Sequence, residues 1–371
     1  MVSTFDKLTL QTGVKRFFIV ILVVFYGHFC WAQSSTPKYS NEFLAIGIDA
    51  RALGMSSAYT SLVKDASSGY WNPAGLTSLN TQYDFGLMHA QYFAGIANYD
   101  YIGFATKIDS LSSLGITAIR FGIDDIPDTR FLYDANGAVN YDNIQFFSAA
   151  DYAFLLSYAR KLSILGGMDV GGSIKIVHRS AGSFAKAWGF GIDLGIKKTF
   201  GNLNLGLMLR DVTGTYNSWS HNTELIADIY TQTNNIIPEN SLEITLPKAI
   251  LGLSYLFKIK KIVSILTTVD FEITVDGQRN TIISSDPISI DPRFGLEIGY
   301  LDKFFLRGGV GYFQEIQNFD RSYTTVYQPN FGLGIDINHL RIDYALTDIG
   351  DQAESPYSHV VSVKFGLDGK E

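Results

Sequence analysis

The sequence predicts an all-β protein, a membrane-spanning barrel of about fourteen antiparallel strands. Three observations support this fold class. Charged residues make up only 18% of the chain and hydrophobic residues 46%, whereas typical soluble domains carry roughly 25% charged residues. Apolar residues alternate with small or polar ones in segment after segment, which is the period of a β-strand. Short and long polar connections alternate between these segments, as expected of an up-and-down barrel.

The composition also excludes several other classes of protein. Aromatic residues account for 14% of the 371 residues, which is far from the aromatic-poor composition of disordered chains. The formal net charge is -7, so the chain lacks the basic footprint expected of a nucleic-acid binder. We therefore expect no nucleic-acid partner.

Residues 1–32 are predicted to be a cleaved signal peptide. Lys15 and Arg16 precede an apolar run over residues 17–26, and Ala32 precedes the expected cleavage point. The run is shorter than the ~20 residues of a spanning helix, although an N-terminal membrane anchor is the alternative. Cleavage would remove Cys30, the only cysteine. The mature chain would then be exported and would have no disulfide or thiol chemistry.

Residues 33–80 form a separate N-terminal segment ahead of the predicted barrel, which comprises residues 81–371. Alternation is absent over residues 44–79, where a short helix-like piece and several turn signals occur instead. Pro73 favours an extended conformation at Asn72, and Gly75 permits a turn. This segment is therefore not expected to contribute strands.

The strands predicted after this segment each have one apolar face and one small or polar face. The clearest ladder places Trp188, Phe190, Ile192 and Leu194 on one face, because successive side chains of a strand point to opposite sides. The ladders fall near residues 82–90, 97–108, 112–122, 150–160, 167–179, 186–198, 201–211, 246–257, 261–274, 292–301, 304–314, 328–337, 339–347 and 357–367.

The connections between the ladders indicate which kind of barrel this is. Short connections lie near residues 109–111, 161–166, 199–200, 258–260, 302–303 and 338, and long ones near 91–96, 123–149, 180–185, 212–245, 275–291, 315–327 and 348–356. Tight turns at one rim and extended loops at the other are typical of outer-membrane barrels. A soluble secreted β-sandwich is the alternative, but its outward faces would carry Lys, Glu and Thr rather than the Gly, Ala and Ser found here.

Several short motifs within residues 44–79 resemble a known family. They read Ala-Arg-Ala-x-Gly-Met, Ala-Tyr, Asp-Ala-Ser and Trp-Asn-Pro-Ala-Gly-Leu. The segment resembles the N-terminal hatch of FadL-like outer-membrane barrels, and most closely that of their PorV/PorQ branch. The resemblance implies a fourteen-stranded barrel with this segment folded into its lumen. The matching residues are Arg51, Gly54, Met55, Tyr59, Asp65, Trp71, Asn72, Pro73, Ala74 and Gly75.

The same resemblance implies a function in the cell outer membrane. PorV- and PorQ-type proteins belong to the type IX secretion system of Bacteroidetes-like bacteria, in which PorV-type members receive the C-terminal domains of secreted cargo. The resemblance therefore implies a non-enzymatic component of protein secretion, whose partners are outer-membrane lipid, other type IX components and cargo. FadL-type members instead transport hydrophobic small molecules across the outer membrane, and this is the alternative function.

Charged residues on the strands are expected to face the lumen. A charge facing lipid at the bilayer midplane would cost roughly 2–4 kcal/mol. Both signs are present, which favours salt bridges that brace the hatch, with Arg51, Lys64 and Asp65 as the hatch-side partners; a gated polar path is the alternative. The predicted luminal charges are Asp193, Lys197, Arg210, Glu297, Arg307, Asp336, Arg341 and Asp343.

Aromatic residues on the two longest loops, 123–149 and 212–245, are candidate anchors for a protein partner, because exposed aromatics often carry binding energy. Alternatively, they pack loop on loop and close the barrel mouth. These residues are Phe131, Tyr133, Tyr141, Phe146, Phe147, Tyr216, Trp219 and Tyr230.

Catalytic and metal-binding patterns are absent from the sequence. The six histidines do not show the spacing of a metal site, and the Asn136-Gly137 pair is better explained by a turn. We therefore expect no enzymatic activity, no cofactor and no metal.

Overall fold

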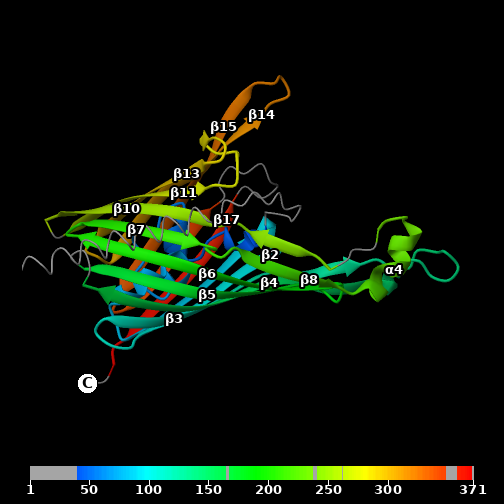
Figure 1. The fold of residues 1–371 in the computed structure, drawn as a ribbon, viewed down its shortest axis with the longest axis horizontal. Coiled ribbons are helices and arrows are strands. Elements are labelled where there is room, and N and C mark those ends of the chain that lie inside the picture. Colours follow the sequence, from blue (N-terminus) through cyan, green and yellow to red (C-terminus); the bar gives the residue numbers. More distant parts are fainter. Residues whose placement is uncertain (1–39, 164–166, 237–239, 261, 348–356, 370–371) are drawn as a thin grey trace, which may run out of the picture. The chain divides into compact units, whose positions relative to one another are not determined.

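The computed structural model describes residues 40–369 except for 164–166, 237–239, 261 and 348–356 (Figure 1). The predicted signal peptide lies outside the described residues.

One continuous antiparallel sheet forms a closed barrel, because the first strand pairs with the last: Phe85 of β1 lies opposite Phe365 of β17. The strands are β1 Tyr83–Tyr92, β2 Ala97–Lys107, β3 Ser112–Asp128, β4 Gln145–Leu162, β5 Met168–Ala181, β6 Ala185–Phe200, β7 Leu203–Arg210, β8 Thr215–His221, β9 Leu242–Thr245, β10 Lys248–Ile259, β11 Val263–Thr274, β12 Ile283–Ser284, β13 Ser289–Tyr300, β14 Phe304–Gln317, β15 Tyr323–Ile337, β16 Leu340–Thr347 and β17 Ser358–Leu367.

The barrel wall contains fourteen strands, as the sequence predicts. β7 and β8 are two parts of one wall strand, because they pair with successive stretches of β6. β9 pairs with β8 and β10 pairs with β7, so β9 and β10 likewise form one wall strand. β12 contributes only the two-residue pairing of Ile283 and Ser284 with β13.

The two faces of each strand differ in the way that the ladders predict. On β6, Trp188 is 54% exposed and Phe190 61% exposed, whereas Ala187 and Asp193 are almost fully buried. Many large apolar side chains thus cover the outside of the barrel, a surface that water would disfavour. The outer face is therefore suited to lipid.

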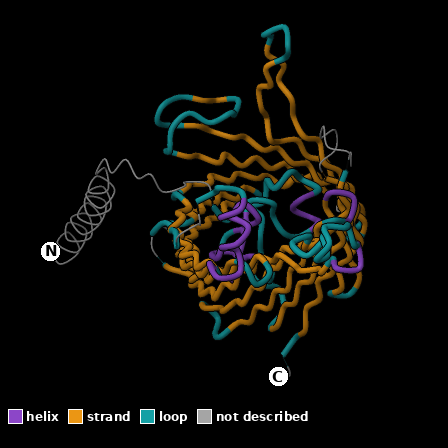
Figure 2. Tube along the Cα trace, turned by 90° about the vertical axis from the view of Figure 1, so that its right-hand side faces the viewer, coloured by secondary structure: helices purple, strands orange, loops and turns teal. Residues whose placement is uncertain are grey.

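The hatch, which we define as residues 40–80, lies inside the barrel. It contains short helical turns at Glu42–Leu44, Ala50–Leu53 (α2), Ser68–Trp71 (α3) and Pro73–Ser78. Most of its residues are buried, and α2 packs against β15, β16 and β17. Figure 2 shows helical segments within the outline of the ring of strands.

Local interactions explain where the hatch turns. Asn72 is extended (φ -166°, ψ 105°), as predicted for a residue before proline. Its Oδ1 accepts a hydrogen bond from the backbone N–H of Ala74 at 3.1 Å, which caps the turn that begins at Pro73. The Asp49 side chain accepts from the Arg51 N–H at 3.1 Å and caps α2 in the same way.

Two segments predicted as loops are partly regular. β3 and β4 continue past a bulge, with Ile126 opposite Phe147 and Asp128 opposite Gln145. Residues 212–245 contain β8, helix α4 (Thr223–Gln232) and β9. Figure 1 shows this region and the β14–β15 hairpin extending beyond the body of the barrel. These extensions have no uniformly apolar face, so alternation of hydrophobicity does not reveal them.

Glycines of the wall allow the hatch backbone to approach closely. A Cβ atom on Gly171 would lie 2.5 Å from the Pro73 carbonyl carbon, and one on Gly206 would lie 2.7 Å from the Thr60 oxygen. Such separations are shorter than van der Waals contact, so no other residue fits without displacing the hatch. Wall glycines with comparable hatch neighbours are Gly195, Gly252, Gly295, Gly309 and Gly332.

The substitution Gly309→Val should displace the hatch, because a Cβ there would lie 2.5 Å from the Ser56 nitrogen. We expect a loss of about 1–3 kcal/mol in the free energy of unfolding and faster proteolysis within residues 40–80. Gly308→Val is the matched control, since its nearest neighbouring atom would be 4.0 Å away. Equal stability and equal protease resistance of the two variants would contradict this account.

Candidate functional site: the hatch and the two luminal cavities

A buried chain of ion pairs joins α2 to three wall strands. Arg51 contacts both carboxylate oxygens of Glu297, at 2.8 Å from Nε and 2.7 Å from Nη2. Arg307 contacts the same carboxylate at 2.6 Å and pairs with Asp343 at 2.8 Å. The side chains of Arg307 and Asp343 are completely buried. Bidentate pairing fixes orientation as well as distance, so this chain holds the hatch in one position.

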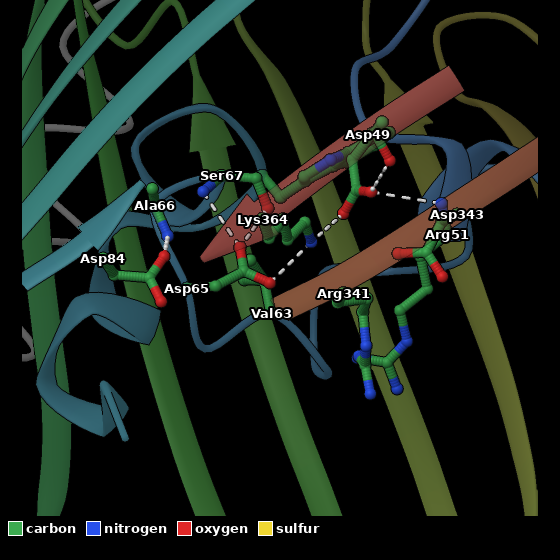
Figure 3. A network of polar contacts seen from close by, with 12 residues as sticks. Asp49, Arg51, Val63, Asp65, Ala66, Ser67, Asp84, Arg341, Asp343 and Lys364 are labelled. Atoms are coloured by element: carbon green, nitrogen blue, oxygen red, sulfur yellow. Dashed lines mark hydrogen bonds and ion pairs between the residues drawn. The ribbon is translucent and has the colours of Figure 1, made fainter. Parts of the chain in front are cut away.

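A second ionic cluster centres on Lys364 of β17 (Figure 3). Its ammonium group pairs with Asp49, which is fully buried, and with Asp65 at 2.7 Å. The Ser67 N–H donates to Asp65 at 2.9 Å, and the Ser362 hydroxyl donates to Asp49 at 3.1 Å. Burial alone would raise the pKa of the Asp65 carboxyl, but Lys364 and Ser67 hold it below its ordinary value.

Other luminal charges contact the hatch backbone. Arg210 lies over the Tyr70 ring, 4.3 Å from its centroid, and donates to the Tyr70 carbonyl at 3.1 Å. Asp270 accepts hydrogen bonds from the N–H groups of Tyr59 and Thr60. Lys197 donates to the Val63 carbonyl. These contacts tie three further points of the hatch to the wall.

Residues of the Trp-Asn-Pro-Ala-Gly motif make contacts both within the hatch and with the wall. The Trp71 ring N–H donates to the Ile48 carbonyl at 3.1 Å. The Asn72 amide donates to the Thr60 carbonyl of the hatch and to the Ile196 carbonyl of β6, both at 3.2 Å. A Cβ on Gly75 would meet the Val63 oxygen at 2.5 Å.

Two other hatch-motif residues lie against the wall. Gly54 faces Gly332, and Met55 faces Gly295. These motif residues thus contact other parts of the hatch or the barrel wall.

The remaining predicted luminal charges also point inward. Asp193 pairs with Lys175 at 3.2 Å, and Lys175 also contacts Asp211 at 2.6 Å. Asp336 and Arg341 pair at 2.7 Å and are only partly buried.

Sequence reasoning missed Lys175, Lys364 and Asp49 as members of these clusters. The two lysines stand on the luminal face of strands with clear alternation, so that pattern would have revealed them. Asp49 lies in the hatch, where apolar and polar residues do not alternate, so no such pattern identifies it.

The hatch leaves a cavity on each side. The turn-side cavity, about 610 Å³, is bordered by the tight turns at residues 201–202 and at Asp302 and His339, and by Lys64 and Asp84. The loop-side cavity, about 490 Å³, is lined by Tyr70, Tyr312, Leu155, Arg210, Arg293 and Glu272, among others. Arg293 pairs with Glu272 at 2.9 Å and lies 4.8 Å from the centre of the Tyr312 ring. Both cavities therefore combine apolar and charged surfaces.

The candidate partner-binding aromatics divide into two groups. Phe147 packs on Phe184 with ring centroids 5.0 Å apart, and Trp219 lies 5.1 Å from the Arg179 guanidinium. Tyr230 is half-buried. The others are exposed, and they are Phe131, Tyr133, Tyr141, Phe146 and Tyr216.

Within the described residues, no group of three or more His, Cys, Asp or Glu side chains is arranged to hold a metal ion. None of the helices in this part of the chain is both long and apolar enough to span a membrane.

Solved structures share the architecture of this chain. One, described as the CymD monoaromatic hydrocarbon channel, matches with a TM-score of 0.53 and 12% identity over 88% of this chain and 99% of that one. The Pseudomonas putida toluene transporter TodX matches with a TM-score of 0.51 and 14% identity over 86% and 96%. The fold is that of FadL-like outer-membrane barrels.

No protein-family model matches the sequence, and no curated protein matches it either.

Removing the central lysine of the second cluster should destabilise the protein. Lys364→Met leaves Asp49 and Asp65 buried without their cation, a change that typically costs about 3–5 kcal/mol. The free energy of unfolding in lipid vesicles provides the measurement. Lys303→Met, at an exposed turn position, should change stability by less than about 0.5 kcal/mol. If Lys364→Met behaves like this control, the cluster does not hold the hatch.

Proposed function

We propose that this protein is an outer-membrane channel for small hydrophobic or amphipathic molecules and that its hatch is the gate. The observation that carries the proposal is the division of one lumen into two cavities by the hatch. Their volumes, about 610 and 490 Å³, lie within the roughly 300–1,000 Å³ of small-molecule sites. A substrate would occupy the loop-side cavity first and then the turn-side cavity.

Two observations support this substrate class. CymD is described as a monoaromatic hydrocarbon channel and TodX as a toluene transporter. In this chain, Tyr70, Tyr312 and Leu155 give the loop-side cavity apolar surface, while Arg210 and Arg293 supply charge. The cavity can therefore accommodate an aromatic or aliphatic body and, beside it, a polar group.

Passage requires the hatch to move. Its residues are buried against the wall, and wall glycines remove the space between the two backbones. Charged and polar contacts make up much of this interface, so water that enters the lumen can solvate both sides when they separate.

A covalent link between hatch and wall should therefore block uptake. Asn330 on β15 donates to the Ser56 hydroxyl at 2.7 Å, so a Ser56→Cys/Asn330→Cys pair in a Cys30→Ser background can be bridged by oxidation or a short thiol crosslinker. We expect at least a tenfold drop in toluene uptake by cells, with recovery after reduction where oxidation formed the bridge. The single Ser56→Cys variant is the control. Undiminished uptake by the bridged protein would refute a moving hatch.

We propose a role in type IX protein secretion as a second candidate. It is supported by the hatch motifs, which resemble the PorV/PorQ branch, and by exposed loop aromatics. Tyr133 is 65% exposed, Tyr141 75% and Phe146 64%, and such side chains are common anchors in protein interfaces. Secreted cargo and other type IX components would be the partners.

The secretion proposal predicts that Tyr133→Ala/Tyr141→Ala reduces cargo on the cell surface several-fold, because two anchor rings are lost. Quantitative mass spectrometry of surface proteins provides the measurement. Phe200→Ala, which removes an exposed aromatic near a turn-side connection, should leave the surface inventory unchanged. A deletion strain that loses toluene uptake but keeps its surface proteins would favour the channel over secretion.

A further inference from the structure

Two lysines stand at the ends of the outward apolar ladder of β6. Lys186 and Lys198 share the face of Trp188 and Phe190, because each lies an even number of positions away from them. Lys198 follows Lys186 by twelve positions, which is roughly 40 Å along a strand. With a strand tilt of about 40°, this distance crosses roughly 30 Å, the thickness of a bilayer's hydrocarbon core. In an outer-membrane barrel the two ammonium groups would therefore lie at the two headgroup levels.

The two rims of the barrel differ in charge. The loop-side connection 123–149 contains five aspartates and one arginine, and connection 212–245 contains four acidic residues and neither lysine nor arginine. The turn side is richer in cations. Among the described residues, the exposed cations there are Arg160, Lys161, Lys258, Lys260 and Lys303, and the exposed carboxylates are Asp109, Asp302 and Asp368. Anionic headgroups are attracted to basic positions at a membrane surface, so the turn-side rim suits them better.

Arg160 and Lys198 lie on either side of β5. The strands β4, β5 and β6 are neighbours in the wall (Figure 1). Arg160 is opposite Val170, and Val170 is opposite Ile196, two positions before Lys198 on the same face. Neighbouring strands are about 4.8 Å apart, so roughly 10 Å separates the backbones of β4 and β6. Two long side chains can span this gap and reach one phosphate group.

Arg160 has donors for an external anion. Its side chain is exposed, and within the part of the chain that the structure describes its guanidinium group makes no hydrogen bond or ion pair. Asp109 on the neighbouring turn attracts it electrostatically. However, the Asp109 carboxylate accepts hydrogen bonds from the N–H groups of Leu111 and Ser112, both at 2.7 Å.

Lys198 is held at the rim, beside surface that suits lipid tails. Its ammonium group donates to the Gly167 carbonyl at 2.5 Å and lies 5.2 Å from the centre of the Phe200 ring. Tyr158 and Leu194 are exposed on the same outward face, farther from the turns. A ligand with an anionic headgroup and apolar chains would match both parts of this surface.

We propose that the outward face of β4–β6 at the turn-side rim binds an anionic phospholipid, whose phosphate group is received by Arg160 and Lys198. A guanidinium group can bind phosphate through two parallel hydrogen bonds, and the acyl chains would cover the apolar ladders. The tight turns of outer-membrane barrels face the periplasm, so the lipid would belong to the periplasmic leaflet. The inference rests on the outer-membrane location that both proposed functions share, and on neither activity.

Native mass spectrometry of the full mature chain tests the proposal. The protein is released from a non-ionic detergent that contains phosphatidylglycerol, which is anionic, or phosphatidylcholine with the same acyl chains, which is zwitterionic. We expect phosphatidylglycerol to bind at least about fivefold more tightly, since each basic residue near an anionic lipid contributes about that factor. Glycerol phosphate should not displace the bound lipid, because it lacks acyl chains.

Variants of the two cations make the assignment specific. Arg160→Gln/Lys198→Gln should weaken phosphatidylglycerol binding about tenfold or more, with an unchanged melting temperature. Lys186→Gln/Arg321→Gln is the matched control, because it removes the same charge from exposed positions at the loop end and should keep the affinity. Arg160→Lys/Lys198→Arg keeps both charges and should also retain binding.

Three results would overturn the proposal. They are equal binding of the two lipids, equal loss of affinity in the Gln double variant and in its control, and displacement of the lipid by glycerol phosphate. Toluene uptake and surface cargo are measured in cells and do not enter this titration, so the lipid site and either proposed function can fail separately.

Discussion

Charge pairing between the hatch and the barrel wall is the constraint on which the rest of this structure depends. An unpaired charge inside a protein is costly, and the lumen contains many charged side chains that point away from lipid. The wall carboxylate Glu297 is shared by Arg51 and Arg307, and the wall lysine Lys364 is shared by two hatch carboxylates. Neither the hatch nor the wall is electrostatically complete without the other.

Shape and charge are complementary at the same interface. Wall strands that carry these charges also carry glycines where the hatch backbone comes closest, as at Gly295 and Gly309 beside Met55. Arg307 and Glu297 stand on the same two strands, β14 and β13. A bulkier wall would hold the hatch farther away and lengthen the ion pairs, so the glycines and the charges act as one arrangement.

The sequence allowed the barrel to be predicted because lipid outside and a small, polar interior impose a strict period of two. It did not allow β8, α4 or β9 to be predicted. These elements extend beyond the body of the barrel, so they do not have lipid on one face and the lumen on the other. The sequence also did not allow the partners of each ion pair to be predicted. Alternation places Asp343 on the luminal face, but only the closed register of the wall brings Arg307 beside it. Lys64 was expected to pair with a wall charge and instead has no carboxylate partner within the described residues.

The proposed channel function requires the hatch to separate from its wall, and an ionic interface suits such a separation. Replacing buried ion pairs with apolar residues is often neutral or stabilising, so stability alone gives little reason for a lumen filled with charge. Separation of an apolar interface would expose it to water at a cost proportional to its area. Separated charges, by contrast, recover hydration as water enters, and this compensates part of the lost pairing. In the proposed channel, the ion pairs of Arg51 with Glu297 and of Lys364 with Asp65 would therefore hold the hatch less firmly once water enters the lumen.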